Sequence, residues 1–115
     1  MREILFRGKR VIDGKWVESC CPLGEMHSGT VTYDFISETV CQYTGLTDKN
    51  GRKIFEGDIL SFSAYGENYK GDVRFIKGNF TIWCGKCAPF LDDALEKHSA
   101  IVIGNIFDNT DLIKE

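Results

Sequence analysis

Residues 42–60 read QYTGLTDKNGRKIFEGDIL, and the character of the chain changes along this stretch. Asp48-Lys49-Asn50-Gly51 combines residues that favour tight turns with a glycine suited to a positive φ angle. Glu56-Gly57-Asp58 then precedes the apolar pair Ile59-Leu60, which is typical of the entry into a buried strand. We therefore expect a turn-rich connector that feeds a β-strand, and no residue in it indicates catalysis.

Short apolar runs separated by turn residues continue after this connector. We expect strands at residues 59–64, 69–76, 80–84 and 100–106, with turns at Gly66, at Gly71 and at Lys77-Gly78-Asn79. Within residues 72–76 and 79–83, apolar and polar positions alternate, as they do in strands with one buried face. The expected product is a small, strongly bent sheet or an SH3-like barrel.

The N-terminal part predicts a β-hairpin. Residues 4–12 and 15–19 are β-prone and flank Asp13-Gly14, a dipeptide favoured in two-residue hairpin turns. Residues 20–30 contain Pro22, Gly24 and Gly29, show no period and are typical of a loop. Further short strands are expected at residues 30–36 and 39–43.

One helix is expected to interrupt the β pattern, at residues 89–98. Pro89 suits the first helical turn, and acidic residues follow it while Lys97 and His98 lie near the expected C-terminal end. The whole chain is therefore interpreted as mainly β, within the α+β class, with this short helix packed on the sheet.

Composition limits the size of the fold and its partners. With 115 residues, 43% of them hydrophobic, the chain fits one domain, 1–115, with a hairpin and loop in 1–39 and a barrel-like part in 40–115. A net charge of −3 gives no general attraction to nucleic acid or to membranes. No apolar run indicates a signal peptide or a membrane span, so we expect a bacterial cytoplasmic protein with reduced cysteines.

Three blocks of sequence carry a family resemblance. REILFRG at residues 2–8, the connector at 42–60 and IGNIFDN at 103–109 resemble, in that order, the YopX family of bacteriophage and prophage proteins. The resemblance implies a phage or prophage origin but no particular activity. A functional surface shared by that family would first be sought at Tyr43, Thr44, Asp48 and Glu56, although turn formation explains the carboxylates equally well.

A cysteine pair suggests two further chemistries. Residues 83–87, WCGKC, resemble a thioredoxin active site in front of a helix, but too little chain follows Cys87 to complete that fold. Cys84 and Cys87 could also be half of a zinc site completed by His98, with further ligands from Cys20, Cys21, Cys41 or His27. No second Cys-x-x-Cys pair exists, so simple packing is favoured and no cofactor is expected.

Basic residues are concentrated at the N-terminus. Arg7 and Lys9 alternate with apolar positions, so they share one face of the first strand, where they could meet phosphates. Aromatic residues such as Trp16, Tyr65 and Tyr69 could add base stacking. Charged residues on an edge hairpin are also an ordinary protection against aggregation, which is the favoured interpretation.

The sequence therefore predicts a non-enzymatic protein that works by binding. Its partner would be a second copy of the chain, in a homo-oligomer, or a host or phage protein, joined through the exposed edges of short strands. Two alternatives remain: a nucleic-acid-binding module that uses Arg7 and Lys9, and a thiol-redox or zinc protein that uses Cys84 and Cys87. No membrane partner is expected.

Overall fold

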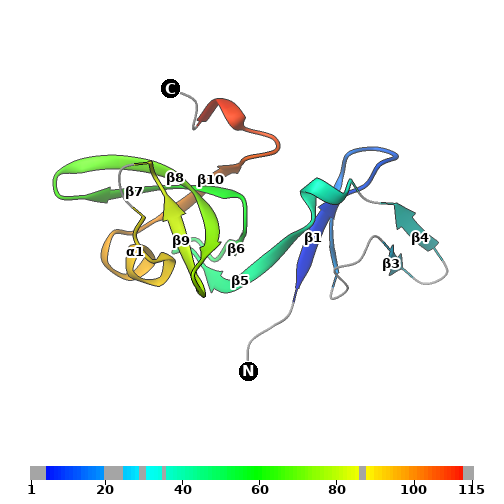
Figure 1. Ribbon diagram of the computed structural model, residues 1–115, viewed down its shortest axis with the longest axis horizontal. Helices are drawn as coiled ribbons and strands as arrows, with labels where there is room; N and C mark the ends of the chain where they lie inside the picture. Colours follow the sequence, from blue (N-terminus) through cyan, green and yellow to red (C-terminus); the bar gives the residue numbers. More distant parts are fainter. Residues whose placement is uncertain (1–4, 20–24, 29–30, 35, 86–87, 113–115) are drawn as a thin grey trace.

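The computed structural model shows a mainly β protein with one α-helix, which confirms the predicted fold class (Figure 1). It describes residues 5–19, 25–28, 31–34, 36–85 and 88–112. Their strands form two four-stranded sheets and one two-stranded hairpin, and every paired strand is antiparallel. Among these residues no helix is long and apolar enough to cross a membrane.

The first sheet contains the N-terminal hairpin and the connector. Its order is β2-β1-β5-β6, with β1 at Phe6–Lys9, β2 at Trp16–Ser19, β5 at Cys41–Thr47 and β6 at Lys53–Phe55. The register of β5 against β6 shifts between Tyr43 and Thr47, around Gly45 at φ +87°. The stretch expected as a connector is therefore a bulged hairpin whose first strand reaches Thr47.

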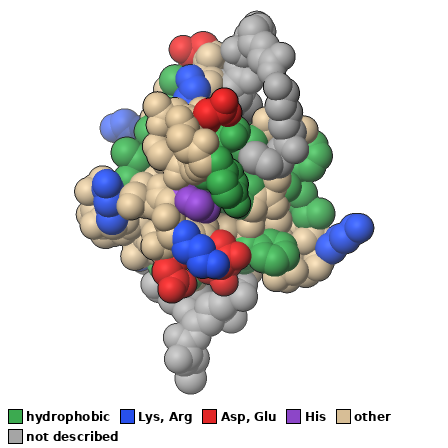
Figure 2. Space-filling model, turned by 90° about the vertical axis from the view of Figure 1, so that its left-hand side faces the viewer, with side chains coloured by type: hydrophobic (Ala, Val, Ile, Leu, Met, Phe, Trp, Pro, Cys, Tyr) green, Lys and Arg blue, Asp and Glu red, His purple; other side chains and the backbone are tan. Residues whose placement is uncertain are grey.

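The second sheet is strongly curled and carries the helix. Its order is β10-β7-β8-β9, with β7 at Asp58–Ala64, β8 at Glu67–Ile76, β9 at Asn79–Trp83 and β10 at Ile101–Asn105. Helix α1 spans Leu91–Lys97 and lies beside β9. Figure 2 shows this end of the molecule, where hydrophobic side chains lie beside a histidine.

Two apolar clusters fill the interior. The larger joins the second sheet to α1 and includes buried residues Ile54, Leu60, Phe62, Val73, Ile82, Leu91 and Ala94. The smaller consists of Cys41, Tyr43 and Phe55, with Leu5 and Phe107 packed against it. The second cluster therefore lies where the first sheet meets the segment that follows β10.

The remaining elements are short. Strand β3 at Glu25–Ser28 pairs with β4 at Val31–Asp34, and 3₁₀ turns occur at Ser37–Thr39 and Thr110–Leu112. The expectation of a loop over 20–30 is wrong for 25–28, which form β3. The sequence EMHS has no clear alternation and ends in Ser28, a residue common in turns, so only its pairing with β4 identifies it as a strand.

The first hairpin turn is longer than predicted. Residues 11–14 lie between Arg10 and Lys15, which pair, and only Gly14 among the turn residues has a positive φ, +69°. Asp13 accepts hydrogen bonds from the Arg10 guanidinium and the Lys15 N–H, and these bonds lower its pKa to about 2. Asp13 thus stabilises a four-residue turn instead of entering a two-residue turn.

Two local predictions need correction. Gly71 lies inside β8, not in a turn, and Pro89 precedes the helix, which begins at Leu91. The carbonyl of Pro89 accepts a hydrogen bond from the N–H of Ile82, so the residue extends the sheet beside β9. Glycine at position 71 is required by space: a Cβ atom there would lie 2.5 Å from the Trp83 carbonyl oxygen.

We predict that Gly71→Ala destabilises the protein by about 1–3 kcal/mol, because the nearest obstacle is backbone that cannot move without separating β8 from β9. Denaturant unfolding measures the loss. Gly78→Asn is the matched control, since Gly78 has open space around it and Asn tolerates its φ of +83°. Equal stability of Gly71→Ala and the parent chain would contradict the proposed clash.

Candidate functional site

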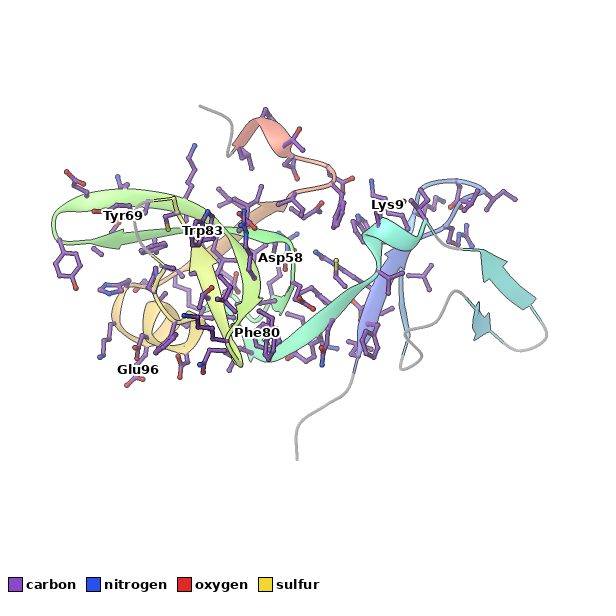
Figure 3. The ribbon with its side chains drawn as sticks, viewed as in Figure 1. Lys9, Asp58, Tyr69, Phe80, Trp83 and Glu96 are labelled. Carbon is purple, nitrogen blue, oxygen red and sulfur yellow. The ribbon has the colours of Figure 1, made fainter. Side chains whose placement is uncertain are left out.

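A buried ion pair joins the two sheets. Arg7 on β1 donates from Nη2 to Oδ1 of Asp58 at the start of β7, at 2.5 Å, and the two side chains are 12% and 2% exposed. The guanidinium also lies between two rings, 4.6 Å from the centroid of Trp16 and 4.7 Å from that of Phe55. Figure 3 shows Asp58 on one side of this junction and Lys9 on the other.

Asp58 also forms the turn that leads into β7. Its Oδ2 accepts the N–H of Phe55 at 2.8 Å, across Glu56 and Gly57. Burial raises the pKa of Asp58, against the opposing effects of the Arg7 charge and the Phe55 N–H. Gly57 adopts φ +84°, and a Cβ there would lie 3.3 Å from the Phe107 ring. The geometry of the turn therefore explains the residue types at Gly57 and Asp58.

Asp48 fastens the β5–β6 turn to the second sheet. Its Oδ1 accepts the N–H groups of Asn50 and Arg52, and its Oδ2 accepts the N–H of Val102 at 3.0 Å. Burial would raise the pKa of Asp48, but these N–H groups outweigh it and lower the pKa. The carboxylate thus binds a backbone N–H group, that of Val102, on the open edge of strand β10.

The segment after β10 returns to the N-terminal hairpin. Oδ1 of Asn105 accepts the N–H groups of Phe107 and Asp108, and its Nδ2 donates to Asp108. Asp108 in turn pairs with Lys9 and accepts the indole N–H of Trp16 at 2.8 Å. Burial would raise the pKa of Asp108, but the hydrogen bonds from Lys9, Trp16 and Asn105 lower it to about 2.

These contacts bring all three family-like sequence blocks to one junction. A groove of about 660 Å³ opens there, lined by Arg7, Trp16, Glu18, Gly51, Arg52, Lys53, Phe55, Ile103, Gly104, Asn105, Asp108 and Asn109. The charged side chains that line this groove include both cations and carboxylates. Its described lining contains no serine, cysteine or histidine.

The four residues first selected for binding do not share one exposed surface. Tyr43 is buried with its ring 5.4 Å from that of Phe55, and buried Thr44 donates to the carbonyl of Ile54. The carboxylate of Asp48 is occupied by three backbone N–H groups. Only Glu56 is partly exposed, where it lines a separate hollow of about 440 Å³ beside Gly57. Tyr43, Thr44 and Asp48 therefore hold the connector in place.

Arg7 and Lys9 share one face, and that face meets carboxylates. Arg7 is paired with Asp58, and Lys9 with Asp108. Both cations are therefore used in joining the hairpin to the C-terminal part. The nucleic-acid alternative based on these two residues receives no support from their surroundings.

Few of the cysteine and histidine candidates belong to the part of the chain that the structure describes. Cys84 lies with Sγ 3.6 Å from the carbonyl of Ile82, and His98 packs near Phe62. Cys87, Cys20 and Cys21, and the side chain of His27, lie outside the described residues. Within the described part no group of three His, Cys, Asp or Glu side chains could hold a metal ion. Burial raises the pKa of Cys41 to about 11, so its thiol stays protonated.

Sequence reasoning missed an exposed aromatic surface on β8 and β9. We call it the outer face and define it by Asp72, Arg74, Trp83 and Phe90. Asp72 lies opposite Trp83, Arg74 opposite Thr81, and a bridge pairs Thr81 with Phe90, so these side chains share one side of the sheet. Trp83 is 39% exposed and Phe90 50%. Their exposure could not be read from the sequence, because alternation does not reveal which face remains uncovered.

The fold and the junction define a small, mainly β protein built around a polar joint between two sheets. A family model described as "YopX protein" matches residues 6–114, and the chain belongs to this family. Among solved structures, the crystal structure of protein EF1440 from Enterococcus faecalis is similar, with a TM-score of 0.67. It is 23% identical, and the match covers 99% of this chain and 100% of that one. A search of curated proteins found no match.

We predict that Asp58→Ala destabilises the protein by about 3–5 kcal/mol, because it leaves the Arg7 charge buried without its partner. The double variant Arg7→Met/Asp58→Leu should recover part of that loss, and denaturant unfolding of both variants measures it. Lys97→Met is the control, since its exposed pair with Asp93 should cost at most about 1 kcal/mol. A loss at Asp58 no larger than this control would contradict the role of the ion pair.

The lowered pKa of Asp108 predicts an acid-sensitive junction. The unfolded carboxyl takes up a proton near 3.8 but the folded one only near 2, so the unfolded state binds more protons in between. Stability should therefore fall as the pH drops from about 4 to about 2. Unfolding midpoints across this range should fall less steeply for Asp108→Asn than for the parent chain. Parallel curves would show that Asp108 does not contribute.

Proposed function

We propose that the protein is a non-enzymatic phage or prophage protein that acts in the bacterial cytoplasm by binding a second copy of itself through the outer face. Membership of the YopX family supports the phage or prophage origin. The observation that carries the binding proposal is the pair of exposed aromatic rings on a sheet whose other side is already covered by α1.

The composition of the outer face suits a protein interface. Trp and Arg are enriched among residues that dominate binding energy, and an exposed tryptophan otherwise has an unfavourable contact with water. The guanidinium of Arg74 lies 5.1 Å from the Trp83 ring centroid and is held by Asp72 at 2.8 Å. The long side chains of this surface are therefore positioned before binding, which reduces the entropy lost on association.

The charges of the outer face favour a copy of the same chain over another partner. Asp72 is buried and neutralises Arg74 beside it, so the outer face has no net charge that would select an oppositely charged partner. In a two-fold dimer each patch meets itself, and residue i of one chain contacts residue j of the other. The aromatic rings of one protomer can then pack against those of its partner.

Strand addition, the route suggested by the sequence, is obstructed at two sheet edges. On β10 the N–H of Val102 is bound by Asp48 and that of Asn105 by the side chain of Asn109. On β9 the N–H of Ile82 is bound by the carbonyl of Pro89. Occupied donors cannot pair with another strand, and this favours association through a sheet face.

The double variant Trp83→Ser/Phe90→Ser tests the proposal. We expect the parent chain to form dimers in native mass spectrometry and sedimentation, and the variant to dimerise at least about tenfold more weakly. Val11→Ser/Ile12→Ser is the matched control, because it removes two exposed apolar side chains from the hairpin turn instead. A monomeric parent chain, or a dimer weakened only by the control, would overturn the proposal.

A further inference from the structure

We propose that the end of the molecule formed by α1 and the β7–β8 turn binds a nucleotide unit, that is, a nucleobase with its phosphate. This site is separate from the outer face and does not depend on the proposed self-association. It consists of two neighbouring hollows that share Phe62 and His98 as a common wall.

The first hollow is aromatic. It measures about 340 Å³ and is lined by Phe62, Ala64, Tyr65, Tyr69, Ala88, Pro89 and His98. Phe62 and Tyr69 stack with centroids 5.4 Å apart and planes 23° apart, which gives a broad apolar wall. Such walls bind flat rings, because every nucleobase has a π face that can stack on an aromatic side chain.

Tyr65 extends this aromatic wall toward solvent. Its side chain is 94% exposed, and its ring centroid lies 6.2 Å from that of His98. The residue adopts φ +54°, a conformation that tyrosine rarely takes. Folding alone gains little from an exposed ring in a strained turn, whereas a ring placed at the mouth of an aromatic hollow can cover a bound base.

The second hollow is cationic and rich in hydroxyl groups. It measures about 370 Å³ and is lined by Lys49, Ser61, Phe62, Ser63, Lys97, His98, Ser99 and Ile101. Among the described residues no carboxylate lines either hollow. Lysine ammonium and serine hydroxyl groups are ordinary donors to phosphate oxygens. This hollow therefore selects an anion.

The two lysines reach this hollow from separate elements. Lys49 belongs to the β5–β6 turn, which Asp48 fastens to β10, while Lys97 ends α1. Lys97 Nζ also lies 3.9 Å from Asp93 Oδ1, but an exposed pair of this kind contributes little and leaves the ammonium available. Cationic residues are favoured near the C-terminal end of a helix, which explains the positions of Lys97 and His98. This preference does not explain Lys49, which lies on a separate turn.

The shared wall determines the class of ligand. A single ligand that fills both hollows spans Phe62 and His98. Such a ligand carries an anionic group beside Lys49 and Lys97. It also carries a flat ring beside Tyr65 and Tyr69. A nucleotide has this arrangement, and each hollow is at the lower end of the usual size of small-ligand sites. Figure 2 shows the histidine at the centre of this end, with hydrophobic side chains beside it and charged ones below.

Isothermal titration of the full chain with adenosine monophosphate tests the site. We expect saturable binding that weakens about tenfold for adenosine, which lacks the phosphate, and that is absent for inorganic phosphate alone. Lys49→Gln/Lys97→Gln should weaken nucleotide binding at least about tenfold. The matched control Lys15→Gln/Lys77→Gln removes the same charge elsewhere and should bind like the parent chain.

A second variant tests the aromatic half without risk to the fold. Tyr65→Asn keeps a residue that tolerates positive φ, and the exposed ring makes little contribution to the core. We expect it to weaken binding about fivefold or more, as the loss of one base stack predicts. Unchanged binding by Tyr65→Asn, or equal losses in both lysine double variants, would overturn the site.

A third titration distinguishes free nucleotide from single-stranded nucleic acid as the ligand. A short single-stranded oligonucleotide with a 5′-phosphate that binds at least tenfold more tightly than the mononucleotide identifies single-stranded nucleic acid. Equal affinities identify free nucleotide. The parent chain binding neither ligand at millimolar concentration would overturn the proposal.

Discussion

The Arg7–Asp58 pair is the constraint on which the arrangement of the two sheets depends. Asp58 ends the β6–β7 turn and begins the second sheet, so the carboxylate that orders a local turn also receives the cation from the first sheet. A buried charge without its partner is costly, and this cost penalises any other placement of the hairpin. The rings of Trp16 and Phe55 beside the guanidinium exclude water and strengthen the attraction.

Side-chain oxygens recur at this junction in place of strand pairing. Asp48 binds Val102 and Asp108 binds Trp16, each across a gap that no β ladder bridges. The bonds from Val102 to Asp48 and from Asn105 to Asn109 also occupy backbone donors of the edge strand β10. The polar network thus joins the parts of the chain and at the same time occupies backbone donors on β10.

The sequence could predict what depends on near neighbours along the chain. The hairpin over residues 4–19, the short β-strands after Asp58 and the helix near residue 90 follow from alternation and from local turn and helix signals. It could not predict β3, because Glu25–Ser28 lacks a local signal, nor the position of Gly71, because a glycine required by close strand packing looks like a turn glycine. Of the binding candidates, Tyr43 and Thr44 are turned inward by contacts with the neighbouring strand β6, and Asp48 by its bond to Val102 on β10.

By itself the sequence determined the fold class and the family, because hydrophobic alternation, turn chemistry and the three blocks are properties of consecutive residues. Only the tertiary structure decided how the charged residues are used. Arg7 and Lys9 meet carboxylates 51 and 99 residues away, which turns a basic strand face into a joint. It also decided which aromatic rings remain exposed, because a side chain's burial depends on what the rest of the chain packs over it.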